Sequence, residues 1–214
     1  MREYYDKQLK KLNDAMIEMG AMIENVIEMA VTALTTQDTE LAKRVVASDD
    51  GIDRQEKEIE NLCMKLLLTQ QPVASDMRQI SSALKMITDM ERIGDHAADI
   101  SELTLLMAGT PYIKNLEHIQ TMAKETMVML VESIEAYVDL DLNKAKRVIL
   151  HDDIVDDLFA TVKQELIKLI CENVANGEQA ADLLMVAKYL ERVGDHATNI
   201  AEWVIYYITG SHVI

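Results

Sequence analysis

The feature that most constrains the fold is an internal repeat, because each half of the chain carries the same two motifs. Residues 89–100, DMERIGDHAADI, match residues 189–200, YLERVGDHATNI, at seven of twelve positions with an offset of 100 residues. Upstream, residues 39–50 match residues 142–153 at six of twelve positions with an offset of 103 residues. Two matches in the same order are not expected by chance, so we predict one structural unit that occurs twice.

Each unit is predicted to contain three long helices. Apolar residues recur at i, i+3, i+4 and i+7, and the 214 residues include only 7 Gly and 2 Pro. Asp38 and Asp141 stand where helix N-caps are expected, and Gly109 and Pro111 mark the boundary between the units. The expected helices span residues 6–36, 39–70 and 74–107 in the first unit, and 113–138, 142–173 and 178–208 in the second.

These patterns predict an all-α protein built from two tandem three-helix bundles related by pseudo-two-fold symmetry. Long helices that are joined by short loops pack antiparallel, which is the arrangement of a helical bundle. The first repeat is assigned to residues 1–108 and the second to residues 113–214.

The composition narrows the classes of function. The formal net charge of −16 opposes nucleic-acid binding and adsorption to an anionic membrane, since both need Lys and Arg. No apolar run reaches the length of a membrane helix, and the N-terminus lacks the apolar core of a signal peptide. Cys63 and Cys171 lie in apolar helical patterns and are predicted to be buried free thiols. We therefore expect a cytoplasmic protein that meets a membrane only through a partner.

Acidic side chains form a stripe on each of the last two helices of both repeats. At 100° per residue, acids that recur at i and i+4 share one helix face. Like charges at this spacing destabilise a helix, and a solvated acidic face is the alternative to a ligand set. Within the first-repeat stripes no Lys or Arg is found to offset the charge. The candidate metal ligands are Asp49, Asp53, Glu91, Asp95 and Asp99 in the first repeat and Asp152, Asp156, Glu191, Asp195 and Asn199 in the second.

The register of the helices predicts that these stripes face each other. In an antiparallel hairpin, residues equidistant from the turn lie at the same height. With the turn centred on Pro72, Asp53 faces Glu91 and Asp49 faces Asp95, and the second hairpin has the same arrangement. Four carboxylates at one level repel strongly unless a multivalent cation neutralises them. Oxygen ligands suit magnesium, calcium, manganese and iron, so we predict one metal site in each repeat.

Two further residues of the repeated motif carry expectations. Gly94 and Gly194 lie in mid-helix, where glycine is unfavourable, which predicts a close approach of a neighbouring helix. His96 and His196 lie about 100° away from the acidic stripe. A surface or half-buried position is the favoured interpretation of both histidines, and a role beside the metal or at an interface is the alternative.

At ERIGDHAADI and ERVGDHATNI the chain resembles the PhoU family, the regulators of bacterial phosphate uptake. The resemblance extends over essentially the whole chain, and its motifs are specific as a set. The family's paired acidic motifs are matched by Glu91/Asp95, Glu191/Asp195, Asp49/Asp53 and Asp152/Asp156.

The resemblance implies a non-enzymatic, metal-binding regulator. It implies iron or zinc at these motifs, with magnesium, manganese or calcium as alternatives, and sites that can hold several ions. It further implies a homodimer that restrains the phosphate-specific ABC transporter through its ATPase subunit. The phosphate sensor histidine kinase is the other implied partner, and negative regulation of the phosphate-starvation response is the implied outcome.

Two other functions were weighed against this one. A di-metal bundle with an oxidase or iron-storage role would use Glu-x-x-His motifs, whereas this chain has Glu-x-x-x-Asp. A histidine phosphotransfer bundle would use His96, but that residue lies beside a row of acids.

The two metal sites are expected to be unequal. Three aligned positions differ between the repeats, and together these differences make the second site less negative. The affinity of oxygen sites for cations rises with the charge of their ligands. We therefore expect the first site to bind metal more tightly. The aligned positions that differ are Glu56 and Phe159, Thr88 and Lys188, and Asp99 and Asn199.

Overall fold

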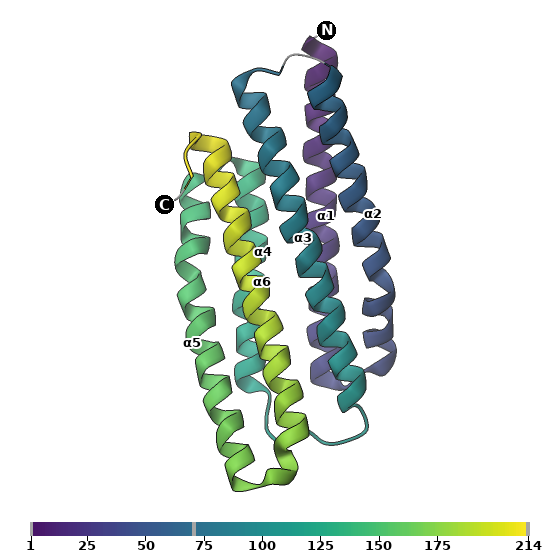
Figure 1. Ribbon diagram of the computed structural model, residues 1–214, viewed down its shortest axis with the longest axis vertical. Coiled ribbons are helices and arrows are strands. Elements are labelled where there is room, and N and C mark those ends of the chain that lie inside the picture. Colours follow the sequence, from purple (N-terminus) through teal and green to yellow (C-terminus); the bar gives the residue numbers. More distant parts are fainter. Residues whose placement is uncertain (1, 70–71, 213–214) are drawn as a thin grey trace.

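The computed structural model describes residues 2–69 and 72–212, and most of these residues lie in long helices (Figure 1). No strand occurs in these two ranges, so the all-α prediction is confirmed. Residue 70, the expected end of the second helix, lies outside the described residues. The helices are α1 (Arg2–Thr36), α2 (Thr39–Thr69), α3 (Ala74–Met107), α4 (Glu117–Asp139), α5 (Leu142–Glu172) and α6 (Gly177–Thr209), with a short 3-10 helix, η1 (Val174–Asn176), before α6.

The first two helices of each repeat are joined by the same short turn. Gln37 and Leu140 are equivalent at the 103-residue offset, and both have left-handed backbones, with φ of 53° and 52°. The residues that follow, Asp38 and Asp141, each accept two backbone N–H hydrogen bonds of 2.9–3.0 Å from the next helix. Both predicted N-caps are therefore confirmed, and each satisfies backbone donors that a helix start leaves open.

The start of α4 differs from the prediction, which placed it four residues too early. The backbone N–H of Ile113 donates to Oε1 of Gln179 at 2.6 Å, and the Lys114 ammonium forms an ion pair with Glu165. These contacts fasten the connecting segment onto α5 and α6, so its backbone does not enter the helix until Glu117. A helix start that depends on partners 51 and 66 residues away has no local signal. The start of α1 was likewise placed four residues too late.

The two sets of three helices pack into one body. α1, α2 and α3 contact one another, as do α4, α5 and α6, while α3 lies against α6 and α1 against α4 (Figure 1). Buried side chains from all six helices form one continuous hydrophobic cluster. Amphipathic helices bury their apolar stripes in this way, and here the stripes of both repeats merge. The assigned boundary between residues 108 and 113 stays a prediction.

The two cysteines occupy different environments. Cys63 is buried in the core, as expected, and burial raises the pKa of its thiol to about 12. Cys171 is exposed, so its predicted burial is wrong. Its neighbour Ile170 packs against the core, and Cys171 lies about 100° further round the last turn of α5.

None of the helices in the described ranges carries an apolar stretch of the length that a bilayer span requires.

Candidate functional site

The acidic stripes of α2 and α3 face each other in the first repeat. Burial, and then the charge of Asp95 on the facing helix, raises the pKa of Asp49. The pKa of Glu91 is raised first by burial and then by Asp95, with smaller contributions from Glu56 and Asp53 across the hairpin. These carboxylates are thus close enough to disfavour one another's charged form, as the register predicted.

The second repeat places the acids of α5 and α6 in the same relationship. The pKa of Asp152 is raised to about 6 by burial first, then by Asp156 on its own helix and Asp195 on α6. The pKa of Asp195 is raised by burial and then by Glu191. Both hairpins therefore contain half-buried carboxylates that repel one another, and the predicted pairing of the stripes is confirmed.

Basic side chains do reach the first-repeat acids, so the expected absence of Lys and Arg there is wrong. Nη1 of Arg92 lies 2.6 Å from Oδ2 of Asp95, and its Nε lies 3.4 Å from Oε2 of Glu91. Nζ of Lys57 lies 3.7 Å from Oδ2 of Asp53. A helical wheel places each residue by its Cα, whereas long Arg and Lys side chains reach neighbours three or four positions away.

In the second repeat the expected cation is present. Lys188 forms an ion pair with Glu191, and its Nζ lies 5.5 Å from the centroid of the Phe159 ring. Each site is therefore partly neutralised by basic side chains of its own repeat. This reduces the difference in charge between the sites, and tighter binding by the first site stays a prediction.

The carboxylates have suitable chemistry for a hard cation, but they do not yet surround one. Across residues 2–69 and 72–212, no three His, Cys, Asp or Glu side chains form a group that could hold a metal ion as they stand. Oδ1 of Asp49, however, is buried without a hydrogen-bond partner, which is a costly state for a carboxylate oxygen. A bound cation would relieve that cost once neighbouring acids rotated toward it. The assignment of these acids as metal ligands stays a prediction.

The last candidates on the two stripes, Asp99 and Asn199, have different partners. Oδ2 of Asp99 lies 3.3 Å from Nδ1 of His96, and Asp99 also raises the pKa of Asp49, although burial has the largest effect there. Nδ2 of Asn199 donates to Oδ1 of Asp89 on α3 at 3.0 Å. Asn199 is therefore engaged with the first repeat rather than with the acids of its own hairpin.

The two histidines lie where α3 crosses α6, at the contact between the repeats. This is the interface position that was the alternative interpretation of both residues. His96 is only 5% exposed and stacks on Tyr189 with ring centroids 5.3 Å apart. Nδ1 of His196 lies 2.8 Å from Oδ1 of Asp89. The favoured surface or half-buried position holds for His196 but is wrong for His96. Asp89 and Tyr189 are equivalent at the 100-residue offset, so the repeat itself was the sequence signal for this cluster.

A polar hollow of about 350 Å³ adjoins the first acidic site. It combines acids of α2 and α3 with a basic side chain of the second repeat, Arg192 on α6. His96 also lines this hollow, and its Nε2 is buried without a hydrogen-bond partner. The first site is thus built at the junction of the repeats, and its lining includes Asp49, Arg92, Asp95, His96, Asp99 and Arg192.

Comparison with known proteins gives a consistent result. One family model, the PhoU domain, matches the chain twice, at residues 16–104 and 119–204. The chain is 38% identical over 213 residues to a Clostridium acetobutylicum protein named phosphate-specific transport system accessory protein PhoU homolog, covering 99% of this chain and 97% of that one. It is 29% identical over 206 residues to the Escherichia coli (strain K12) protein named phosphate-specific transport system accessory protein PhoU, covering 96% and 86%.

Solved structures agree with these relatives. The crystal structure of PhoU from Pseudomonas aeruginosa superimposes with a TM-score of 0.94 at 30% identity, covering 97% of this chain and 100% of that one. The phosphate transport system regulatory protein PhoU from Streptococcus pneumoniae gives a TM-score of 0.90 at 27% identity, covering 98% and 99%. With two family matches that span most of the chain and relatives that align over nearly all of it, this protein belongs to the PhoU family.

Proposed function

We propose that this protein is a non-enzymatic accessory protein of a phosphate-specific transport system and that metal ions bind at its two acidic hairpins. The observation that supports the role most strongly is the alignment of almost the whole chain with proteins named as accessory proteins of that system. The repeated, mutually repelling carboxylates support the metal. Iron or zinc is the proposed ion, with magnesium, manganese or calcium as alternatives, and a site with several ions is included.

The metal would supply positive charge rather than reaction chemistry. In the first hairpin it would be held by Asp49, Asp53, Glu91 and Asp95, which lie on two helices. Neutralising their repulsion would brace α2 against α3, and the corresponding acids would brace α5 against α6. Asp99 and Asn199 adjoin the interface between the repeats, so metal loading would bear on how the repeats pack.

The proposed partners are the ATPase subunit of the phosphate ABC transporter and the phosphate sensor histidine kinase. The protein would act in the cytoplasm as a homodimer and reach the inner membrane through these partners. It would restrain phosphate uptake and keep the starvation response off when phosphate is plentiful. The oxidase or iron-storage alternative draws no support from the residues, because no Glu-x-x-His occurs in the sequence.

A deletion strain tests the role. Removing the gene is expected to raise expression of a phosphate-responsive reporter in phosphate-rich medium and to leave phosphate uptake poorly restrained. Complementation with the wild-type gene should restore repression, and the double variant Asp95→Ala/Asp195→Ala should restore it less well at equal protein abundance. Normal repression in the deletion strain would overturn the proposed role. Full complementation by the double variant would show that the role does not depend on Asp95 and Asp195.

A further inference from the structure

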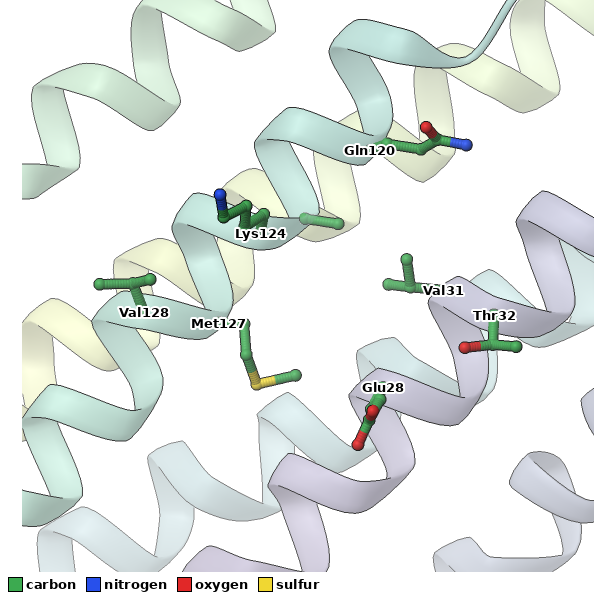
Figure 2. Close-up of a pocket in the computed structure, with 8 residues that line it drawn as sticks. Glu28, Val31, Thr32, Gln120, Lys124, Met127 and Val128 are labelled. Atoms are coloured by element: carbon green, nitrogen blue, oxygen red, sulfur yellow. The ribbon is translucent and has the colours of Figure 1, made fainter.

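An apolar groove runs along the contact between α1 and α4, the two helices that lie behind α3 and α6 in Figure 1. The helices are antiparallel, and two hollows follow one another between them. The first, of about 290 Å³, is lined by Glu28, Val31 and Thr32 of α1 and by Lys124, Met127 and Val128 of α4 (Figure 2). The second, of about 190 Å³, is lined by Ile17, Ala21 and Glu24 of α1 and by Val131, Ile134 and Glu135 of α4. We call the two together the α1–α4 groove.

The floor of the α1–α4 groove is apolar and open to solvent. Val31 and Met127 extend into the space between the helices (Figure 2), and Ile17 and Val128 are 42% and 38% exposed. A contiguous line of exposed apolar side chains is typical of a docking surface, whereas single exposed residues are not.

The shape of the groove favours a helix over a small molecule. From Ile17 to Thr32, α1 covers about 22 Å, or about four helical turns. Small-molecule sites enclose their ligand, whereas this groove is a linear channel between two helices. At Gly20, an added Cβ would lie 3.0 Å from Cγ2 of Ile134, so α1 and α4 touch closely beneath the channel. The groove is therefore held in shape before anything binds to it.

The charges on the rim indicate which charge the occupant carries on the side that faces α1. Glu24 and Glu28 are exposed, lie one turn apart on α1, and make no ion pair within the described part of the chain. Glu135 is already paired with Lys144 at 2.8 Å. Lys124, on the α4 rim, makes no ion pair with any residue in the described ranges. An occupant with Lys or Arg on the side facing α1 would meet two uncompensated carboxylates.

We propose that the α1–α4 groove is the docking site for a basic amphipathic helix of a partner protein. Its apolar residues at i, i+3, i+4 and i+7 lie on the groove floor, and its Lys and Arg residues face Glu24 and Glu28. The inference deepens the proposed regulatory function, because a protein without chemistry of its own acts through what it binds.

The test is a titration of purified full-length protein with a fluorescein-labelled 18-residue peptide of Leu and Lys, with Leu at helical spacing, read by fluorescence anisotropy. Glu24→Lys/Glu28→Lys is expected to weaken binding about tenfold, because two favourable rim contacts become unfavourable. Lys124→Glu is expected to strengthen binding, since it removes a cation from the rim and adds a third unpaired acid. The matched control Glu18→Lys/Glu58→Lys changes the net charge equally at exposed acids outside the groove and should leave affinity unchanged.

Three outcomes would overturn the proposal. Equal loss in both double variants would mean general attraction to an acidic protein, and equal binding of a scrambled peptide of the same composition would exclude helix recognition. The third is a wild-type dimer that Val128→Glu converts to a monomer in sedimentation velocity, because a second copy would then cover the groove. Circular dichroism of each variant establishes that it folds. The titration does not depend on the phosphate response of the cell. A deletion strain with normal repression would therefore overturn the regulatory role without affecting the proposal that the groove binds a helix.

Discussion

A Cβ at Gly94 would lie 2.7 Å from Cδ1 and 3.2 Å from Cγ2 of Ile52, so α3 crosses α2 at a separation that glycine alone accommodates without movement. Ile52 is 1% exposed and has little room to shift. At the equivalent Gly194, the nearest atoms are Oδ1 of Asp152 at 3.4 Å and Cγ1 of Val155 at 3.5 Å, which is looser. The predicted close approach of a neighbouring helix is confirmed at Gly94, whereas a Cβ at Gly194 would make only ordinary van der Waals contacts.

Alanine at these two glycines is expected to have opposite effects. Gly94→Ala should lower the free energy of unfolding by about 1 kcal/mol, because overpacking costs about 1–3 kcal/mol and the gain in helix propensity returns about 1 kcal/mol. Gly194→Ala should be neutral or stabilising by up to about 1 kcal/mol, since it gains the propensity without a severe clash. Urea unfolding of both variants measures the difference, and equal changes would contradict it.

Asp152→Asn is expected to stabilise the metal-free protein at neutral pH. The folded-state pKa of Asp152 is about 6, above its ordinary value of 3.8, so folding favours the protonated form. That contribution to stability is fully present below the ordinary pKa and is lost as the pH rises through 6. The amide cannot ionise, so the variant should gain over wild type at pH 7.5, and the gain should shrink at pH 4. Urea midpoints in a chelator measure this, with the exposed Asp157→Asn as the control. A gain of the same size at both pH values would refute the explanation.

Metal ions are expected to raise the melting temperature. A ligand that binds only the folded state stabilises it by about 2.7 kcal/mol at one hundred times its Kd, or about 5–10 °C for a chain of this size. Ferric, zinc and manganese ions are tested in turn by scanning calorimetry against a chelated sample. The double variant Asp95→Ala/Asp195→Ala should lose most of the gain. Identical melting curves with and without metal would exclude the proposed sites.

The basic residues beside the acids are expected to compete with metal. Arg92 pairs with Asp95 in the first repeat, and Lys188 pairs with Glu191 in the second. Arg92→Gln and Lys188→Gln should therefore each raise the affinity of their own site in a calorimetric titration. Unchanged affinity in both would show that these ion pairs do not limit binding.

The order of affinity between the two sites is a separate expectation. The first site has the larger set of acids, so Asp95→Ala should cost more metal affinity than Asp195→Ala. An equal or reversed loss in the same titration would refute the asymmetry. The ion pair between Arg92 and Asp95 would then explain why the first site binds metal no more tightly than the second.

Asp89 is expected to hold the two repeats together. Its Oδ1 contacts Nδ1 of His196 at 2.8 Å and accepts from Nδ2 of Asn199 at 3.0 Å, and the side chain is 15% exposed. Asp89→Ala leaves both partners unpaired, which should lower the free energy of unfolding by about 1–3 kcal/mol. The exposed acid Glu58 is the control, and Glu58→Ala should change stability by less than about 0.5 kcal/mol. Equal changes in stability for the two variants would show that the contact of Asp89 with the second repeat does not stabilise the protein.

Several parts of the molecule followed from local pattern alone. The repeat, the helices, the Asp38 and Asp141 caps and the facing acidic stripes were all predicted, because helical periodicity is a local property and the position of the turn sets the register of a hairpin. The same reasoning failed where a side chain reaches beyond its own position on the helix. The side chain of Arg92 reaches Asp95, three residues further along α3, and the start of α4 is set by contacts with α5 and α6.

The sequence by itself determined an all-α duplicated chain with two acidic hairpins, since 100° per residue and the symmetry of each turn place those groups. Only the tertiary structure decided how the two repeats meet. The burial of His96 against Tyr189 and the α1–α4 groove arise from packing between helices about 100 residues apart. A helical wheel describes one helix and carries no information on which face the other repeat covers, so the surfaces left open for a partner had to be read from the packed molecule.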